Sequence, residues 1–249
     1  GLDNSKILEQ RGDTVKYLYP YLNILHDTEL QINSFAFNVL KEVIDLGGGL
    51  AGVPRQIPYH HPPKPIDIET NETALKEWKL ESSLIYTKNN KLAGQKVATN
   101  QLIKIAEEFK DYESFWHEYT ADFRLRVYPS CTVLSPQSGD MGRGIIQFHR
   151  GHRLGDHGYK WLSISLCNHI GEDKISFSDR ERYVHDHGEV IKRCVSDPLH
   201  NTEWMQWDNP FQGLLTAKEW VDARGDRSGY ISHTPVHVDG SCNGFQHYA

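Results

Sequence analysis

The chain has 249 residues, of which 24% are charged and 38% hydrophobic, a balance that excludes a disordered protein and fits a globular one. Its formal net charge is −6, so charge alone does not indicate nucleic-acid binding, although a local basic groove stays compatible with it. No apolar run reaches the roughly 18 residues of a membrane span, and four widely spaced cysteines predict no disulfide framework or Cys-type zinc site, which indicates an intracellular, reducing compartment.

The first half of the chain is predicted to be helical. Apolar residues from Ile32 to Ile44 recur at helical spacing, and the glycines at 47–49 end this run. A proline-rich connector then extends from Pro54 to Pro65 and is typical of an extended linker between helical units.

Two further helices are predicted after this connector. One begins near Asn71 and the other near Thr99, and each carries apolar residues at helical spacing. The polar, basic stretch 88–96 separates them and has the composition of a turn. We therefore expect an antiparallel helical pair.

The hydrophobic period changes to two over residues 122–128. There, apolar residues alternate with Arg124, Arg126 and Tyr128. This alternation predicts a half-buried strand that carries both arginines on one face. Residues 144–148 are the second predicted strand.

Helical patterns return in the second half, and a last strand follows them. The predicted helices are one with Leu162, Leu166 and Ile170 on a shared face, one from a Ser178–Glu181 capping box to about Cys194, and one from Asn209–Pro210 through Trp220. The last predicted strand spans 233–239, and Asp239 stands at its end.

Several histidine and tryptophan residues are interpreted as structural or as surface residues. His185 and His187 stand two apart on a predicted helix, where they point away from each other and cannot share a zinc ion easily. The pair at 60–61 lies in the proline-rich connector and is read as exposed. Trp204 and Trp207 are more typical of packing than of base stacking.

Asp239 is the first residue whose position indicates chemistry. A carboxylate at the end of a short strand is held rigidly, and Gly240 leaves its own backbone carbonyl accessible to an ion. Mg²⁺ prefers such oxygen ligands and keeps several waters. An Asp-Gly dipeptide alone is more typical of an ordinary turn than of a metal site.

The run from Val238 to Ala249 closely resembles the first carboxylate motif in the palm of single-subunit DNA-directed RNA polymerases of the phage and mitochondrial type. The resemblance implies that Asp239 is catalytic and binds two Mg²⁺ ions, with help from the Gly240 carbonyl. It also implies that Ser241 and Gly244 bind the nucleotide. Related DNA polymerases carry a bulky acidic residue where Gly244 stands, so this glycine favours ribonucleotides.

Residues 122–128 and 135–144 resemble a second signature of the same family. This resemblance implies that four residues contact the template strand and the RNA–DNA hybrid: Arg124, Arg126, Gln137 and Arg143. Arginines on one face make contacts to phosphates that do not read the base sequence. The family usually has glycine where Leu125 stands, and this difference favours altered local contacts. By contrast, His26-Asp27-Thr28 only mimics the second carboxylate motif of the family and is interpreted as structural.

The resemblance covers nearly the whole chain and implies an α+β, mostly helical fold, a partial right-hand polymerase. The expected units are 1–60, a helical segment that leads to the thumb; 61–113, a thumb-like helical pair; 114–152, the first palm strands; 153–229, a helical palm insertion; and 230–249, a palm strand with the aspartate motif.

The resemblance further implies a fragment of a transcribing enzyme that uses a DNA template and ribonucleoside triphosphates. Its fingers and second metal carboxylate are expected after Ala249, so the fragment alone is expected to be inactive. A mitochondrial matrix or a phage-infected cell is the expected location, and transcription factors are expected partners if the enzyme is mitochondrial. Two alternatives remain: a DNA polymerase of the same palm class, and a non-catalytic nucleic-acid-binding homologue, which Leu125 favours.

Overall fold

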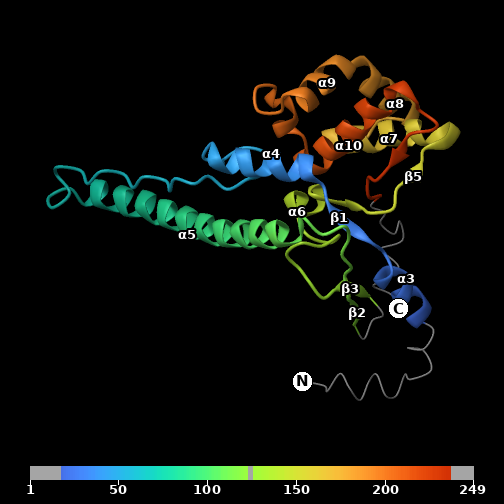
Figure 1. The fold of residues 1–249 in the computed structure, drawn as a ribbon. Helices are drawn as coiled ribbons and strands as arrows, with labels where there is room; N and C mark the ends of the chain where they lie inside the picture. Colours follow the sequence, from blue (N-terminus) through green and yellow to red (C-terminus); the bar gives the residue numbers. More distant parts are fainter. Residues whose placement is uncertain (1–17, 123–125, 237–249) are drawn as a thin grey trace, which may run out of the picture.

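The computed structural model describes residues 18–122 and 126–236 and shows an α+β fold in which helices predominate (Figure 1). The α-helices are α3 (Tyr19–His26), α4 (Ser34–Asp45), α5 (Glu72–Phe109), α6 (Asp140–Gly144), α7 (Gly155–Ile170), α8 (Phe177–Asp186), α9 (Gly188–Ser196) and α10 (Pro210–Asp222). The short 3-10 helices are η1 (Thr202–Gln206) and η2 (Ala223–Gly225). None of the described helices is long and apolar enough to cross a membrane.

Six short strands form three antiparallel pairs. They are β1 (Leu30–Ile32) with β4 (Ile146–Phe148), β2 (Tyr119–Ala121) with β3 (Val127–Pro129), and β5 (His152–Arg153) with β6 (Ile231–Ser232). Two of these pairs, β1–β4 and β5–β6, join segments that are far apart in the sequence. The strands therefore connect the segments around the helices and do not form one continuous sheet in the described residues.

Helix α10 lies between two hydrophobic cores. The first core contains residues of α4, of β1 and β4, and of the C-terminal part of α5, together with Phe211 and Leu214 of α10. The second contains residues of α7, α8 and α9, together with Ala217 and Trp220 of α10. Figure 1 shows α10 among α7, α8 and α9, above α6. Because successive turns of α10 belong to different cores, this helix joins the two parts of the molecule.

A single helix, α5, replaces the predicted helical pair, and that prediction is wrong. The stretch 88–96 is helical, and Leu92 within it is buried. Its polar residues bind the connector: the Asn89 amide accepts from Tyr59 N (2.8 Å) and donates to Tyr59 O (2.9 Å), and Lys96 Nζ donates to Gln56 O (3.0 Å). Asparagine and glycine each destabilise a helix by at most about 1 kcal/mol relative to alanine. The contacts with the connector compensate for this cost.

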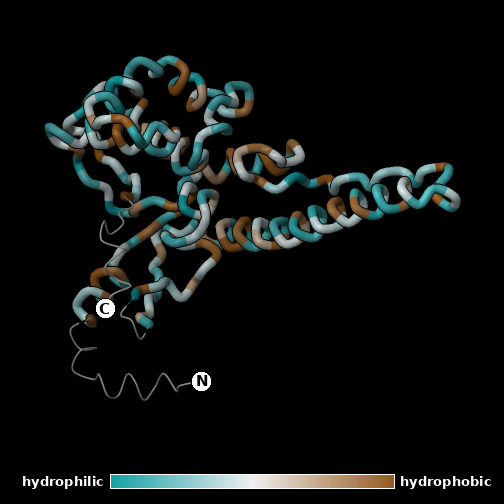
Figure 2. The backbone as a smooth tube through the Cα atoms, turned by 180° about the vertical axis from the view of Figure 1, so that it is seen from behind, coloured by the Kyte–Doolittle hydropathy of each residue, from teal (hydrophilic) through white to brown (hydrophobic). Residues whose placement is uncertain are grey.

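The connector itself is extended, as predicted, and runs back along α5 (Figure 1). Trp78 Nε1 on α5 donates to Pro62 O (3.1 Å) and adds a third contact between the two segments. The apolar residues of α5 that join the first core lie towards its C-terminal end, where the helix meets the body (Figure 2). The opposite end of α5 projects from the body, and among the described residues the connector lies beside it.

Helix α4 confirms the first predicted helix, with one change at its start. Ile32 belongs to β1, and Asn33 caps the helix by accepting from Ala36 N (2.9 Å). Gly47, with φ of +106°, follows the helix and turns the chain, which confirms the stop predicted from the glycine run.

The predicted strand over 122–128 is instead part of a hairpin. Ala121 lies opposite Val127, so the chain reverses direction between them. Asp122 N donates to Arg126 O (2.9 Å), and Arg126 N donates to Asp122 Oδ1 (3.0 Å). Alternation of apolar and polar residues cannot distinguish one strand from two short strands around a turn, and here the Asp122 carboxylate supports the turn.

Among the later helices, α7 and α10 confirm the predictions, whereas the helix predicted from Ser178 to about Cys194 differs. Its cap is Ser176, whose hydroxyl accepts from Asp179 N (3.2 Å), and the helix divides into α8 and α9 at His187. The next residue, Gly188, lies against Trp220: a Cβ there would be 3.1 Å from the indole ring. Glycine at this position therefore lets the start of α9 pack closely against α10.

The prediction of a last strand over 233–239 is wrong for its described part, because 233–236 have no strand structure. The strand β6 comprises Ile231 and Ser232, just before the predicted range. The backbone N–H groups of His233 and Thr234 donate to the Glu219 carboxylate and not to a neighbouring strand, and Pro235 has no N–H group. Residues 237–239 lie outside the described residues.

Candidate nucleic-acid interface and metal-ligand segment

Three of the predicted site residues lie within the described part of the chain: Arg126, Gln137 and Arg143. Arg124 and the whole carboxylate motif lie outside the described residues. That motif comprises the predicted metal and nucleotide ligands Asp239, Gly240, Ser241 and Gly244. The structure therefore describes the chain up to residue 236, before this motif, and the roles of the motif residues stay predictions.

The hairpin β2–β3 and the loop after it bring two predicted residues together. Arg126 is exposed where the hairpin closes. Gln137, which follows eleven positions later, donates from Nε2 to the backbone oxygen of Val127 (3.1 Å). This bond fixes the loop against the strand that begins beside Arg126. The arrangement places an exposed guanidinium group and an exposed amide at the same end of the hairpin.

Arg143 comes from a third element, the short helix α6. Its backbone N donates to Gly139 O (3.0 Å), which closes the helical turn. Its side chain is partly buried, and Nε has no hydrogen-bond partner among the described residues. A buried guanidinium N–H without an acceptor costs free energy, so this side chain is suited to donate a hydrogen bond to an acceptor from outside the described residues.

Two residues beside Arg143 hold α6 against α10. The Asp140 carboxylate accepts from Phe211 N (2.8 Å), Gln212 N (3.2 Å) and Gln212 Nε2 (3.0 Å) at the N-terminus of α10. Negative charge is favourable at this end of a helix. Gly144 lies so close that a Cβ there would be 2.7 Å from Gln212 N. The sequence did not predict the hydrogen bond between Asp140 and Phe211, because these residues are 71 positions apart.

A second carboxylate, Glu219 of α10, binds the segment that precedes the carboxylate motif. It accepts hydrogen bonds from three consecutive residues: Ser232, His233 and Thr234. The side chain of Glu219 is 5% exposed. No local sequence signal distinguishes Glu219 from the other acidic residues of the helices, so sequence reasoning missed it too.

A polar cavity of about 530 Å³ lies beside Glu219. Its lining includes Asn33, Gln147, Lys218, Tyr230 and His233. Burial, followed by the charges of Glu219 and Asp222, raises the pKa of Tyr230 to about 12, so this phenol stays protonated at neutral pH. The cavity mixes both signs of charge and therefore has no single preferred charge for a ligand.

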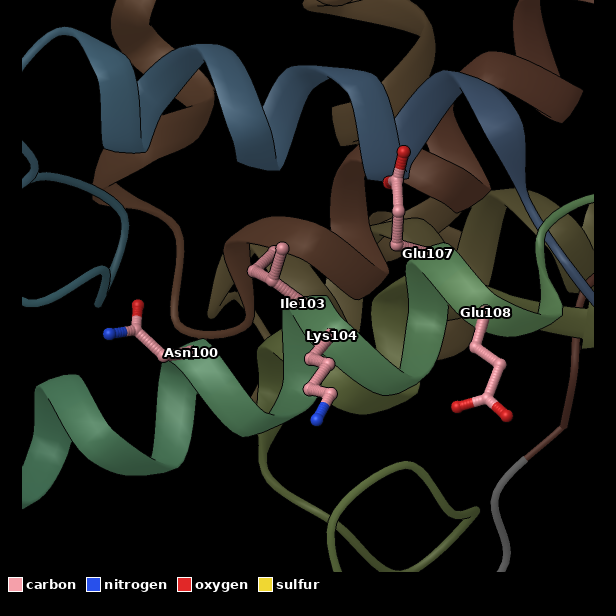
Figure 3. Close-up of a pocket in the computed structure, with 5 residues that line it drawn as sticks. All are labelled: Asn100, Ile103, Lys104, Glu107 and Glu108. Carbon is pink, nitrogen blue, oxygen red and sulfur yellow. The ribbon is translucent and has the colours of Figure 1, made fainter.

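The pocket on α5 in Figure 3 is a groove along an exposed helix, with a volume of about 560 Å³. Its carboxylate Glu107 points towards α4 and pairs with Lys41 (3.5 Å) and Lys110 (2.6 Å), whereas Lys104 and Glu108 point away from α4 (Figure 3). The hydrogen bond from Lys110 lowers the pKa of Glu107. The charged groups do not converge, so this groove has no catalytic arrangement.

The residues interpreted as structural have contacts that agree with that interpretation. Tyr119 N donates to His26 Nε2 (2.8 Å), which ties α3 to the hairpin. Trp204 is fully buried, with Nε1 donating to Pro198 O (2.8 Å), and Trp207 packs against the first core. His185 and His187 are exposed. Within 18–122 and 126–236, no three His, Cys, Asp or Glu residues are grouped to hold a metal ion.

Comparison with known proteins identifies the family. The sequence profile described as "DNA-dependent RNA polymerase" matches residues 152–249, which include Asp239. The chain is 32% identical over 93% of its length to the DNA-directed RNA polymerase of Enterobacteria phage T3, and 34% identical over 96% to the mitochondrial DNA-directed RNA polymerase of Neurospora crassa. The chain belongs to this polymerase family. T7 RNA polymerase of Escherichia phage T7 is a further relative, 32% identical over 76% of the chain.

The chain spans about a quarter or less of the length of these polymerases. It covers 26% of the phage T3 protein, 17% of the Neurospora protein and 21% of the phage T7 protein. Helix α10, its contact with α6 and the segment bound to Glu219 are thus parts of a polymerase-family segment. Membership of the family confirms the resemblance that the motifs at 122–144 and 238–249 indicated.

Proposed function

We propose that this chain is the thumb-to-palm segment of a DNA-directed RNA polymerase, which joins ribonucleotides to an RNA end as directed by a DNA template. The observation that carries the proposal is the family match through residues 152–249, which includes Asp239 in a motif characteristic of the family. The related proteins from phages, mitochondria and chloroplasts are all named as RNA polymerases. Their shared name supports transcription over DNA replication.

Asp239 and Gly240 are the proposed Mg²⁺ ligands of this segment. A carboxylate and a backbone carbonyl are both oxygen donors, and this donor set fits a hard cation. Two such ions, when bound, activate the attacking hydroxyl group and stabilise the leaving oxygen. A second carboxylate from another part of the polymerase is needed to complete the site. Ser241 contacts the nucleotide, and Gly244 leaves room for its 2′-hydroxyl group.

The proposed nucleic-acid contacts come from the hairpin region and α6. Arg124 and Arg126 bind phosphates of the template strand or of the RNA–DNA hybrid, and their charge holds the backbone without reading bases. Gln137 donates its remaining amide hydrogen to the same strand. Arg143 offers its unpaired Nε to a phosphate oxygen, which supplies the missing acceptor.

The proposed division follows the predicted units, with one revision. Residues 61–113 form the thumb as a single helix, α5, with the connector beside it. Residues 1–60 join it to an N-terminal part of the enzyme, 114–152 and 230–249 belong to the palm, and 153–229 form an insertion in the palm. The proposed location is a mitochondrion or a phage-infected cell, and transcription factors are partners in the mitochondrial case.

Nucleotide choice by the full-length polymerase that contains this segment tests the proposal. With a DNA template and either ribo- or deoxyribonucleoside triphosphates, ribonucleotides should be incorporated at least as efficiently as deoxyribonucleotides, because Gly244 leaves the 2′-hydroxyl group unobstructed. A preference for deoxyribonucleotides would instead establish a DNA polymerase of the same palm class. Template binding without incorporation of either would establish a non-catalytic homologue.

A further inference from the structure

Glu219 is a buried carboxylate whose hydrogen-bond donors come from one short segment. Oε1 accepts from His233 N (2.7 Å), and Oε2 accepts from Thr234 Oγ1 (2.6 Å) and Thr234 N (3.3 Å). The Ser232 hydroxyl donates to Oε2 as well. These donors belong to residues 232–234, and the described chain ends two residues later, at 236, before the carboxylate motif.

This arrangement constrains the segment strongly. A buried carboxylate is costly unless its oxygens are hydrogen-bonded, and hydrogen bonds to a charged group are about twice as strong as those between neutral groups. All four donors of Glu219 are neutral groups from 232–234. Moving the segment would therefore leave the charge of Glu219 without its partners.

The opposite side of the same segment is held by residues 148–153. Ile231 and Ser232 pair with Arg153 and His152, and Phe148 N donates to His233 O (3.0 Å). A Cβ at Gly151 would be 2.8 Å from Ser232 O, so the two backbones are in direct contact. The segment is thus enclosed between residues 148–153 and Glu219.

Helix α10, which carries Glu219, is itself fixed at its other end. The Asp140 carboxylate binds the N-terminus of α10, and α10 packs into both hydrophobic cores. One rigid helix therefore connects α6, which carries Arg143, to the segment that leads to Asp239. Asp239 follows Thr234 by five positions, which span at most about 18 Å of extended chain.

We infer that Glu219 is a positioning residue for Asp239: by anchoring 232–234 to α10, it sets the position of the metal-binding aspartate relative to the nucleic-acid contacts of the hairpin and α6. This inference rests on the proposed polymerase function. Glu219 does not touch the reacting groups and acts only through the segment it binds.

The test compares Glu219→Gln and Glu219→Ala in the full-length polymerase with Asp222→Asn as a matched control. Asp222 is an exposed carboxylate on the same helix. Glutamine keeps the size of Glu219 but has only one acceptor oxygen, so His233 N or Thr234 N loses its partner. We expect kcat to fall about tenfold with glutamine and about 100-fold with alanine, at an unchanged KM for ribonucleotides and unchanged template affinity.

A second readout separates positioning from general stability. In the glutamine variant, the Mg²⁺ concentration needed for half-maximal rate should rise, and Mn²⁺ binding to the enzyme–template–primer complex, followed by EPR without turnover, should weaken. The control should match the wild type in both. Ser232→Ala with Thr234→Val removes two donors from the other side of the contact, leaves α10 intact, and should reproduce the glutamine effect even if an α10 variant fails to fold.

Two outcomes would overturn the inference. One is wild-type metal dependence in the Glu219→Gln and Ser232→Ala/Thr234→Val variants; the other is a lower melting temperature that accounts for the whole loss of rate while Mn²⁺ binding is unchanged. Failure of the proposed function gives a different result, because the wild-type protein would then incorporate no ribonucleotide. Weaker Mn²⁺ binding in the Glu219 variants alone would still support the positioning role in that case.

Discussion

Asp140 and Gly144 stand four positions apart on α6, and both serve its contact with α10. The carboxylate of Asp140 binds backbone N–H groups at the start of α10, and Gly144 allows the backbones of the two helices to approach. Residues in the glycine-rich run 139–144 therefore meet packing requirements that are independent of any contact with nucleic acid. Arg143 is the residue of this run whose side chain has an unpaired donor.

Gly144→Ala should lower the free energy of unfolding of the chain by about 1–3 kcal/mol, because the new Cβ would lie 2.5 Å from the backbone carbon of Phe211 and the helices must separate. Gly139→Ala is the control, since a Cβ at Gly139 meets nothing within 4 Å. Urea denaturation measures both. Equal stability of the two variants would contradict the close-contact interpretation.

His117 should make the stability of the fold depend on pH. It is 8% exposed, and burial lowers its pKa below the usual 6.5. The unfolded chain therefore binds a proton first as the pH falls, so stability is full above pH 6.5 and is lost as the pH falls from 6.5 towards the pKa in the folded state. His117→Phe retains the aromatic packing with Phe115 and removes this titration. Denaturation at pH 7.5 and 5.5 should show a smaller loss in the variant; an equal loss would exclude this role.

At the scale of elements, the sequence correctly predicted helices that are marked by a start signal or by a shared apolar face. Asn209–Pro210 marked the start of α10, and the shared apolar face of Leu162 and Leu166 marked α7. Two of the wrong predictions fall where a distant residue supplies the hydrogen-bond partner. The 88–96 stretch stays helical through its contacts with Tyr59 and Gln56, and His233 donates its backbone N–H to Glu219 and not to a neighbouring strand.

The candidate site shows the same difference between residues with a local sequence signal and residues whose partners are distant in the sequence. The sequence singled out Arg126, Gln137 and Arg143 by motif, and the structure adds that Gln137 fixes the loop to the hairpin. Asp140 and Glu219 could not be found in this way, because Asp140 acts on residues 71 and 72 positions away, and the donors of Glu219 become its neighbours only once β5 and β6 pair. Hydrogen bonds of this kind depend on the tertiary fold, which a single sequence does not display.

The continuity of α5 can be tested within the helix. Gly94 is exposed in its interior, and a Cβ there meets nothing within 4 Å. Gly94→Ala should therefore stabilise the chain by about 0.5–1 kcal/mol, because alanine loses less conformational entropy in a helix. A helical pair with a turn at Gly94 predicts a neutral or negative effect.

Gly48→Ala provides the contrast. Gly48 has φ of +64°, and a Cβ there would lie 3.0 Å from the carbonyl carbon of Pro54. This substitution should destabilise the chain by more than about 1 kcal/mol. Thermal denaturation of both variants, with circular dichroism at a helix-sensitive wavelength, measures the two effects on one scale.

At the scale of the whole molecule, the described residues form a frame around α10. The first core joins α10 to α4 and the C-terminal part of α5, and the second joins it to α7, α8 and α9. Asp140 of α6 binds the N-terminus of α10, and Glu219 near the C-terminal end of α10 binds the segment 232–234. In a polymerase-family segment, this frame connects the hairpin and α6, where we propose contacts to nucleic acid, to the chain that leads to Asp239. A rigid connection suits an enzyme that must align a primer end with a metal site.

Asp239→Asn in the full-length polymerase tests the central claim most directly. Asparagine keeps the shape of the side chain but removes the charge that the proposed Mg²⁺ site requires. We predict that RNA synthesis on a DNA template falls by at least about 10²–10³-fold, whereas the affinity for the template–primer duplex stays within about twofold of the wild type. RNA synthesis at the wild-type rate by this variant would contradict the account.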